Sequence, residues 1–234
     1  LAVKALSDIN RNGAYANIKL QEYLQKYHLS DLDRRFFTEL VYGVIRRKNY
    51  LDAIIIHFVK RPLKKLSSMV VEILRLGIYQ IIYMDKVPES AAVNESVKLA
   101  KKLTRGLSGF VNAVLRSVLR ESDSISIGEL AKSEAEEISF IYNQPLWLVN
   151  LWMNEMGKDK TIDLCAWFNE QPRLTARINT IKVYIEDCLK ELQDLGWTVE
   201  QDTYIPEVVY IDGHQGHLEK AKPVIDGHIT FMDK

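Results

Sequence analysis

The 234-residue sequence contains only two cysteines, Cys165 and Cys188, too few for a disulfide framework and without the spacing of a zinc site. No apolar run approaches the roughly 18 residues that a membrane-spanning helix needs. Lys4, Asp8 and Arg11 interrupt the first turns, so the sequence shows no secretory leader. These absences exclude a disulfide-stapled or membrane-spanning chain. We therefore expect a reduced, cytoplasmic setting and no membrane partner.

The short motifs that mark many active sites are also missing. The sequence contains no Walker loop, no GxGxxG, no GxSxG and no HExxH. His214, His217 and His228 come closest to a metal-binding group, but their glycine-flanked loop does not fix a coordination geometry. We expect no catalytic residue, no cofactor-binding residue and no metal site within these 234 residues.

The net charge of zero hides a strong asymmetry between the two halves. Residues 1–121 hold 21 lysines and arginines against 11 aspartates and glutamates, and residues 122–234 hold the remaining 10 against 20. A basic half of this kind favours a polyanionic partner, and nucleic acid is the leading interpretation.

Apolar residues recur at three- and four-residue steps throughout residues 1–121, which predicts helices. Six are expected: a short helix around Val3–Ile9, one over Tyr15–Tyr27, one long helix from an Asp31 N-cap to Phe58, one over Leu66–Tyr83, one begun by Pro88, and one over Phe110–Leu119. Because the connections are short, we expect a compact all-α bundle over residues 1–121.

The second half has a different character. Residues 122–137 are rich in serine and acid and poor in large apolar groups, which predicts a linker. Beyond them, helical patterns cover 146–156, 160–168 and 186–195, and strand patterns cover 174–179, 197–201 and 208–211. This order predicts a small α+β domain, RRM-like or ferredoxin-like, over residues 138–234. A strand-like run ends at the last residues, so we expect that domain to be incomplete and the chain to be a piece of a longer protein.

Clustered cations identify the candidate RNA-binding residues. Their charges neutralise phosphates and release counterions. In the strand predicted over 174–179, Arg177 and Asn179 are two residues apart and therefore share one face, so they are added to the set. The candidates are Lys4, Arg11, Arg34, Arg35, Arg46, Arg47, Lys48, Arg105, Arg116, Arg177 and Asn179. The alternative for the cations is an ordinary solvated helix face, and for Arg177 and Asn179 it is the ordering of the following loop.

Three stretches of the first half resemble a known family. ELVYGVIR at residues 39–46 resembles the E-L-x-Y-G-x-x-R signature of NusB-type RNA-binding domains. ILRLGIYQ at residues 73–80 and GFVNAVLR at residues 109–116 resemble later helices of the same domain. The resemblance implies a NusB-like fold and RNA binding for residues 1–121.

The second half resembles one class of proteins that contain a NusB-like domain. PLWL at residues 145–148, RLTARIN at 173–179 and GHITFMD at 227–233 are similar to segments of the RsmB (Sun/Fmu) class of ribosomal RNA cytosine-C5 methyltransferases. The sequence departs from that pattern at Asn143-Gln144 and at Met232. In that class a NusB-like and an RRM-like domain precede a Rossmann-like catalytic domain, whose cysteine thiolate attacks cytosine C6 and which binds S-adenosylmethionine.

The resemblance implies that small-subunit ribosomal RNA is the partner and that S-adenosylmethionine binds only the full-length protein. The DLCA at residues 163–166 lacks the glycines of the family's cofactor loop, so we expect Cys165 and Cys188 to be helix-core residues. Contact with the downstream methyltransferase domain is a further expectation. The alternative function is a NusB-like transcription antitermination or protein–protein scaffold module without enzyme activity.

Overall fold

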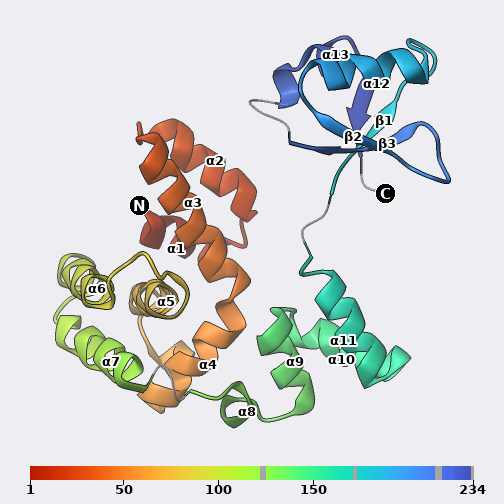
Figure 1. The fold of residues 1–234 in the computed structure, drawn as a ribbon. Coiled ribbons are helices and arrows are strands. Elements are labelled where there is room, and N and C mark those ends of the chain that lie inside the picture. Colours follow the sequence, from red (N-terminus) through yellow and green to blue (C-terminus); the bar gives the residue numbers. More distant parts are fainter. Residues whose placement is uncertain (122–124, 171–172, 214–217, 233–234) are drawn as a thin grey trace. The chain divides into compact units, whose positions relative to one another are not determined.

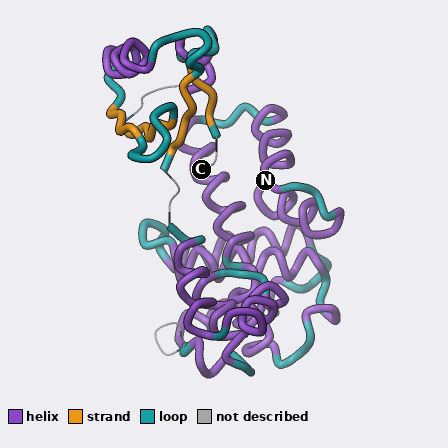
Figure 2. Tube along the Cα trace, turned by 90° about the vertical axis from the view of Figure 1, so that its right-hand side faces the viewer, coloured by secondary structure: helices purple, strands orange, loops and turns teal. Residues whose placement is uncertain are grey.

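The structure is a computed structural model that describes residues 1–121, 125–170, 173–213 and 218–232. It divides into two compact units, Leu1–Asn169 and Glu170–Lys234. The first unit is helical, and the strands that the structure describes all belong to the second (Figure 2).

Residues 1–121 form an all-α bundle built around one central helix (Figure 1). Its helices are α1 (Ala2–Asn12), α2 (Ala16–Lys26), α3 (Asp31–Arg46), α4 (Lys48–Val59), α5 (Ser68–Tyr83), α6 (Glu89–Leu103) and α7 (Ser108–Glu121), with a 3-10 turn at Leu63–Lys65. Helix α5 packs against α1, α3, α4, α6 and α7, and every residue from Val70 to Tyr79 is buried. Burial on all sides explains why α5 is mostly apolar, with Glu72 and Arg75 as its buried charged residues.

Two details of the expected helices are wrong. The long helix expected from residue 31 to residue 58 is broken at Arg47, whose φ of −94° and ψ of 8° separate α3 from α4. Both helices bury an apolar side in the same core, so the apolar periodicity continues across a one-residue break. The N-cap of α3 is Ser30, whose Oγ accepts a hydrogen bond from the backbone N–H of Asp33 at 3.2 Å. Asp31 is the first residue of the helix itself.

The segment expected to be a linker is largely helical where it is described. Helix α8 (Ile127–Leu130) packs against α4, and α9 (Glu134–Tyr142) begins with Ser133 as N-cap. Helices α10 (Leu146–Met156) and α11 (Lys158–Trp167) follow, and Ala135, Ile138, Val149 and Cys165 make a small core between α9, α10 and α11. The compact units therefore divide after Asn169 and not at residues 122–137. The few apolar residues of the segment, such as Ile127 and Leu130, are enough to attach it to the bundle.

The second unit is a four-stranded antiparallel sheet with helices on one face (Figure 1). Its elements are β1 (Leu174–Ile178), α12 (Ile185–Asp194), β2 (Thr198–Gln201), β3 (Val208–Asp212), a 3-10 turn at Leu218–Lys220, α13 (Lys222–Ile225) and β4 (Ile229–Phe231). The strand order β2-β3-β1-β4 and the β-α-β-β-α-β sequence are those of the ferredoxin-like arrangement. The strand-like run expected near the last residues is β4, which pairs with β1 at an edge of the sheet.

Ala176, Ile178 and Ile211 point from the sheet into a core that also contains Leu192 and Cys188 of α12. Cys165 and Cys188 are both buried helix residues, as expected. Among the described residues, no helix combines the length and apolar character that crossing a bilayer requires.

Candidate nucleic-acid interface

Most of the predicted RNA-binding side chains lie at the surface. Eight are exposed: Lys4 and Arg11 on α1, Arg34, Arg35 and Arg46 on α3, Arg105 between α6 and α7, Arg116 on α7, and Arg177 on β1. Arg47, Lys48 and Asn179 are half-buried. The eight exposed side chains are able to contact phosphates. Arg47, Lys48 and Asn179 also make contacts within the protein, which gives them structural roles as well.

The start of α1 lies close to the end of α6. Lys4 of α1 and Lys102 of α6 both lie within electrostatic reach of the backbone nitrogen of Leu1, although they are far apart in the sequence. Lys101 and Arg105 adjoin Lys102 and are exposed. We call Lys4, Lys101, Lys102 and Arg105 the α1–α6 basic surface. The candidate set from the sequence contained only two of its four residues.

A second cationic group lies in a cleft between α3 and α5. The cleft has a volume of about 260 Å³, and its α3 side carries Glu39, Tyr42, Gly43, Arg46 and Arg47. The residues of the E-L-x-Y-G-x-x-R pattern follow one another along one side of α3 because three- and four-residue steps place them on successive turns. Because of this helical spacing, residues of the signature form one wall of the cleft.

The opposite wall is made by Tyr79 and Tyr83 of α5. A Cβ atom added to Gly43 would lie 2.1 Å from the ring of Tyr79, so only glycine allows the two helices to approach this closely. The Tyr79 hydroxyl donates a hydrogen bond to Oε1 of Glu39 at 2.5 Å. The Arg47 guanidinium lies 4.8 Å from the centre of the Tyr83 ring, in cation–π geometry.

The charges of the cleft are coupled through Tyr79. Burial, and then the Glu39 carboxylate, raise the pKa of Tyr79 well above its ordinary value, while Arg47 and Arg46 act in the opposite direction. Tyr79 therefore remains a hydrogen-bond donor at any physiological pH. Both guanidinium groups lie within electrostatic reach of its hydroxyl, so the cleft brings two cations, one carboxylate and aromatic rings together.

Tyrosines make the stability of the bundle sensitive to alkali. Burial raises the pKa of Tyr83 to about 12, against an ordinary value of about 10. Above pH ~10 the native state keeps a Tyr83 proton that the unfolded state loses. The contribution of Tyr83 to the free energy of unfolding is therefore fully present below pH ~10 and is lost as the pH rises toward ~12. Urea unfolding followed by circular dichroism at several pH values should show this fall, and Tyr83→Phe should make it shallower. Tyr204→Phe, at a side chain 89% exposed, should leave the pH profile unchanged. Identical profiles for the wild type and Tyr83→Phe would contradict this assignment.

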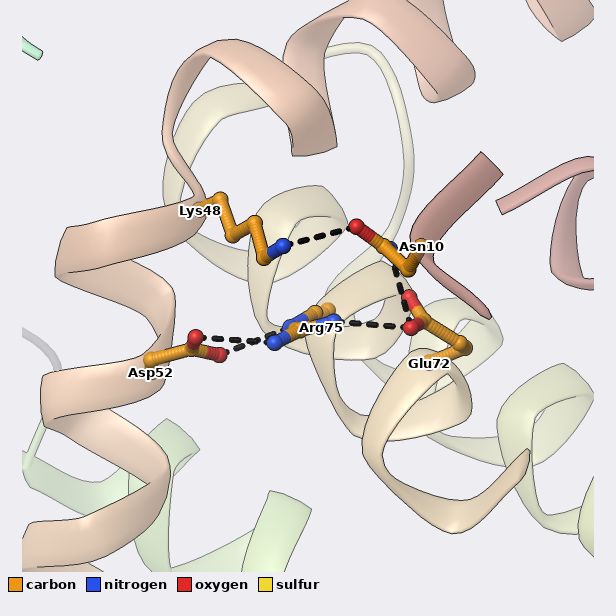
Figure 3. Close-up of polar contacts among 5 residues, drawn as sticks. All are labelled: Asn10, Lys48, Asp52, Glu72 and Arg75. Atoms are coloured by element: carbon orange, nitrogen blue, oxygen red, sulfur yellow. Dashed lines mark hydrogen bonds and ion pairs between the residues drawn. The ribbon is translucent and has the colours of Figure 1, made fainter. Parts of the chain in front are cut away.

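Lys48 takes part in a buried polar network (Figure 3). Its Nζ donates to Oδ1 of Asn10 at 2.7 Å, and Nδ2 of Asn10 donates to Oε1 of Glu72 at 2.9 Å. The same Glu72 oxygen accepts from Nη1 of Arg75 at 2.7 Å, and Arg75 also forms a two-bonded ion pair with Asp52 at 2.7 and 2.8 Å. The network joins α1, α4 and α5 below the surface. Lys48 therefore links the start of α4 to Asn10 near the end of α1.

The exposed face of the sheet gives little support to base stacking. The Arg173 guanidinium lies 4.3 Å from the centre of the Tyr210 ring and pairs with Glu200 and Asp212. The Tyr210 hydroxyl donates to Asp202 at 2.6 Å. A ring covered and fixed in this way is not an open stacking platform.

The strand residues of the candidate set have different surroundings. Arg177 is exposed on β1, and its RNA role stays a prediction. The Asn179 side chain donates to the backbone oxygen of Gly227 at 3.1 Å and accepts from the N–H of Ile181 at 3.3 Å. The loop-ordering alternative is therefore realised for Asn179.

One group of metal-ligand type occurs in the described part of the chain. Ligand atoms of Glu191, Asp226 and His228 lie within 4.8 Å of one another. Nδ1 of His228 is 2.8 Å from Glu191, and Lys222 lies 3.9 Å from Asp226, so these groups already have partners. His214 and His217 lie outside the described residues. The absence of a metal site stays a prediction.

Comparisons with known proteins agree with this architecture. Residues 1–120 match the NusB family, and residues 144–216 match the Methyltr_RsmF/B-like, ferredoxin-like domain. "Probable ribosomal RNA small subunit methyltransferase B" of Synechocystis sp. is 37% identical over 243 residues, covering 100% of this chain and 52% of that protein. "Transcription antitermination protein NusB" of Finegoldia magna is 30% identical over 128 residues, covering 54% of this chain and 93% of that protein.

A solved structure shares the fold over nearly the whole chain. The crystal structure of PH0851 superposes with a TM-score of 0.63 at 18% identity, covering 99% of this chain and 52% of that chain. The chain spans about half the length of the methyltransferase relatives that it matches throughout. The chain belongs to the NusB family through residues 1–120 and continues into the ferredoxin-like domain of RsmF/B-like methyltransferases.

Proposed function

We propose that these residues are the RNA-recognition region of a cytoplasmic, S-adenosylmethionine-dependent enzyme that methylates cytosine C5 in small-subunit ribosomal RNA. In this proposal the chain holds the RNA, and the cofactor and the methyl transfer belong to a downstream catalytic domain. The domain bounds 1–121, 122–137 and 138–234 remain part of this proposal, and the helices up to Asn169 belong to the same compact unit as the bundle.

One observation carries the proposal. The relative from Synechocystis, named "Probable ribosomal RNA small subunit methyltransferase B", aligns with the whole chain and so with both units in the same order. A NusB antitermination protein aligns with little more than half of the chain. A match over the whole of this chain therefore favours the methyltransferase branch over the antitermination alternative.

The charge distribution supports RNA as the partner. Residues 1–121 carry ten more cationic than anionic side chains. The cations include those of the α1–α6 basic surface and those of the cleft between α3 and α5. Exposed lysines and arginines on a rigid bundle position a phosphate backbone and carry no sequence information directly. We assign this role to Lys4, Arg11, Arg34, Arg35, Arg46, Arg47, Arg105 and Arg116, and no catalytic role to any residue of the chain.

The test is the salt dependence of RNA binding. The purified chain should bind a small-subunit rRNA fragment, with an affinity that falls steeply between about 50 and 200 mM salt, as fluorescence anisotropy can measure. Lys4→Glu combined with Arg105→Glu should weaken binding to all RNA sequences and lower the salt slope by about 2, because each lost phosphate contact removes about 1. The chain alone should transfer no methyl group from radiolabelled S-adenosylmethionine.

The control is a single charge reversal in the second unit, compared with Lys4→Glu and Arg105→Glu made one at a time. Lys190→Glu changes an exposed lysine of α12 and should leave RNA affinity nearly unchanged. RNA binding that is indifferent to salt, or equal losses for Lys190→Glu and the two single variants, would contradict the proposal. A chain that binds no RNA and instead binds a protein partner, unaffected by Lys4→Glu and Arg105→Glu, would establish the scaffold alternative.

A further inference from the structure

The cleft between α3 and α5 has the groups needed to select a nucleotide, beyond holding a phosphate. Arg46 is exposed at its rim and forms no ion pair with any described residue. Arg47 lies against Tyr83, and Tyr42 is 37% exposed. Unpaired RNA bases are bound in proteins by stacking on aromatic rings and guanidinium planes and by hydrogen bonds to their Watson–Crick edges. Because Arg47 already covers the Tyr83 ring, the stacking surface that the cleft offers is Tyr42, which is exposed.

Glu39 supplies the polar group that distinguishes bases. Its Oε1 accepts the hydrogen bond from Tyr79, and Tyr79 is buried and fixed between α3 and α5. The bond sets the orientation of the carboxylate but occupies only one of its roughly four lone-pair positions. Glu39 is exposed at the cleft, so the two oxygens remain able to accept two parallel N–H groups.

Guanine matches this acceptor pair better than the other bases. Its Watson–Crick edge presents N1–H and the N2 amino group side by side, both as donors. Adenine and cytosine present one donor beside a ring-nitrogen acceptor, and uracil presents one donor between two carbonyl oxygens. An acceptor that faces a carboxylate is repelled and left without a partner. In a duplex this edge is occupied by the complementary base, so the matching ligand is an unpaired guanine.

We infer that the cleft between α3 and α5 binds one unpaired guanine nucleotide of the RNA, with Glu39 accepting from the base and Arg46 contacting the adjoining phosphate. This inference rests on the proposed RNA-binding function and adds base selection to it. Tyr79 and Gly43 act as positioning residues, because Tyr79 orients the carboxylate and Gly43 permits its approach.

The experiment compares uridine-rich single strands that carry one central guanosine, adenosine, cytidine or inosine. Inosine keeps N1–H and lacks the N2 amino group. The wild-type chain should bind the guanosine strand on the order of tenfold more tightly than the others, the discrimination typical of a bidentate base contact. Glu39→Gln keeps an oxygen that can accept from Tyr79 but replaces one acceptor with a donor, so the preference for guanosine should fall to less than about threefold on the same scale.

Glu89→Gln provides the matched control, since it makes the same charge change at an exposed residue of α6 and should retain the preference. The inosine comparison on the wild-type chain needs no variant, so it decides the question even if Glu39→Gln unfolds the protein. Equal affinity of the wild type for guanosine and inosine strands would overturn the inference, as would an unchanged preference in folded Glu39→Gln. Salt-sensitive binding without base preference would leave the proposed RNA function standing, whereas no binding to any strand would remove both.

Discussion

Replacing Arg75 by methionine is expected to lower the free energy of unfolding by about 3–5 kcal/mol, the usual cost of removing one partner from a buried ion pair. The side chains of Arg75 and Glu72 are only 7% and 4% exposed. Without the guanidinium, the side chains of Glu72 and Asp52 lose their ion-pair partner and the hydrogen bonds that it donates, which leaves buried polar atoms uncompensated. Urea unfolding at neutral pH, followed by circular dichroism, measures the loss.

Two further variants show whether the loss comes from unpaired charge. Arg116→Met removes an exposed arginine from α7 and should change stability by no more than about 0.5 kcal/mol. Combining Arg75→Met with Glu72→Leu removes the most deeply buried orphaned charge and should recover part of the loss, because apolar replacement of a whole buried pair is often tolerated. A single variant Arg75→Met that is nearly as stable as the wild type would show that the network is not formed.

Gly43→Ala should destabilise the bundle by about 1–3 kcal/mol, in the range of overpacked cores. In a helix this substitution normally stabilises by roughly 0.5–1 kcal/mol, so the sign itself is informative. The cause is the ring of Tyr79, which the added Cβ would approach to 2.1 Å and which cannot move without breaking its bond to Glu39. The shift in urea midpoint measures the effect.

The same substitution at Gly109 provides the control. Gly109 lies in α7 with no atom within 4 Å of its added Cβ, so Gly109→Ala should be neutral or stabilising. Tyr79→Leu should remove the obstacle, and Gly43→Ala should then cost much less in the Tyr79→Leu background than alone. Equal effects of Gly43→Ala in both backgrounds would mean that Tyr79 does not set the limit.

Helical periodicity was sufficient for the bundle because most of its helices bury one continuous apolar side. It could not locate the break at Arg47, since a single residue with non-helical ψ leaves the apolar spacing on either side intact. It also missed α8, whose four residues are too few to show a period and are held by contact with α4. Short apolar segments acquire their structure from packing, which a sequence pattern does not record.

The sequence predicted only part of the candidate site, because residues that are far apart in the sequence meet there once the helices pack. Of the residues that line the cleft, the candidate set contained Arg46 and Arg47, which the sequence marks as members of a cation cluster. Tyr79 is 40 residues away from Glu39, and no feature of the sequence joined the two before the helices were packed. Lys48 looked like its basic neighbours, and only the position of Asn10, 38 residues earlier, shows that it faces inward.

The turn at Arg47 has a practical consequence for anyone who mutates the basic triplet. Arg46 faces solvent, Arg47 rests on an aromatic ring, and Lys48 reaches into the interior. Alanine scanning across these three positions would therefore mix two phenotypes, weaker binding and weaker folding, in one series. Affinity and melting behaviour have to be recorded side by side for each variant, because removing Lys48 removes a positive charge and also the hydrogen bond to Asn10.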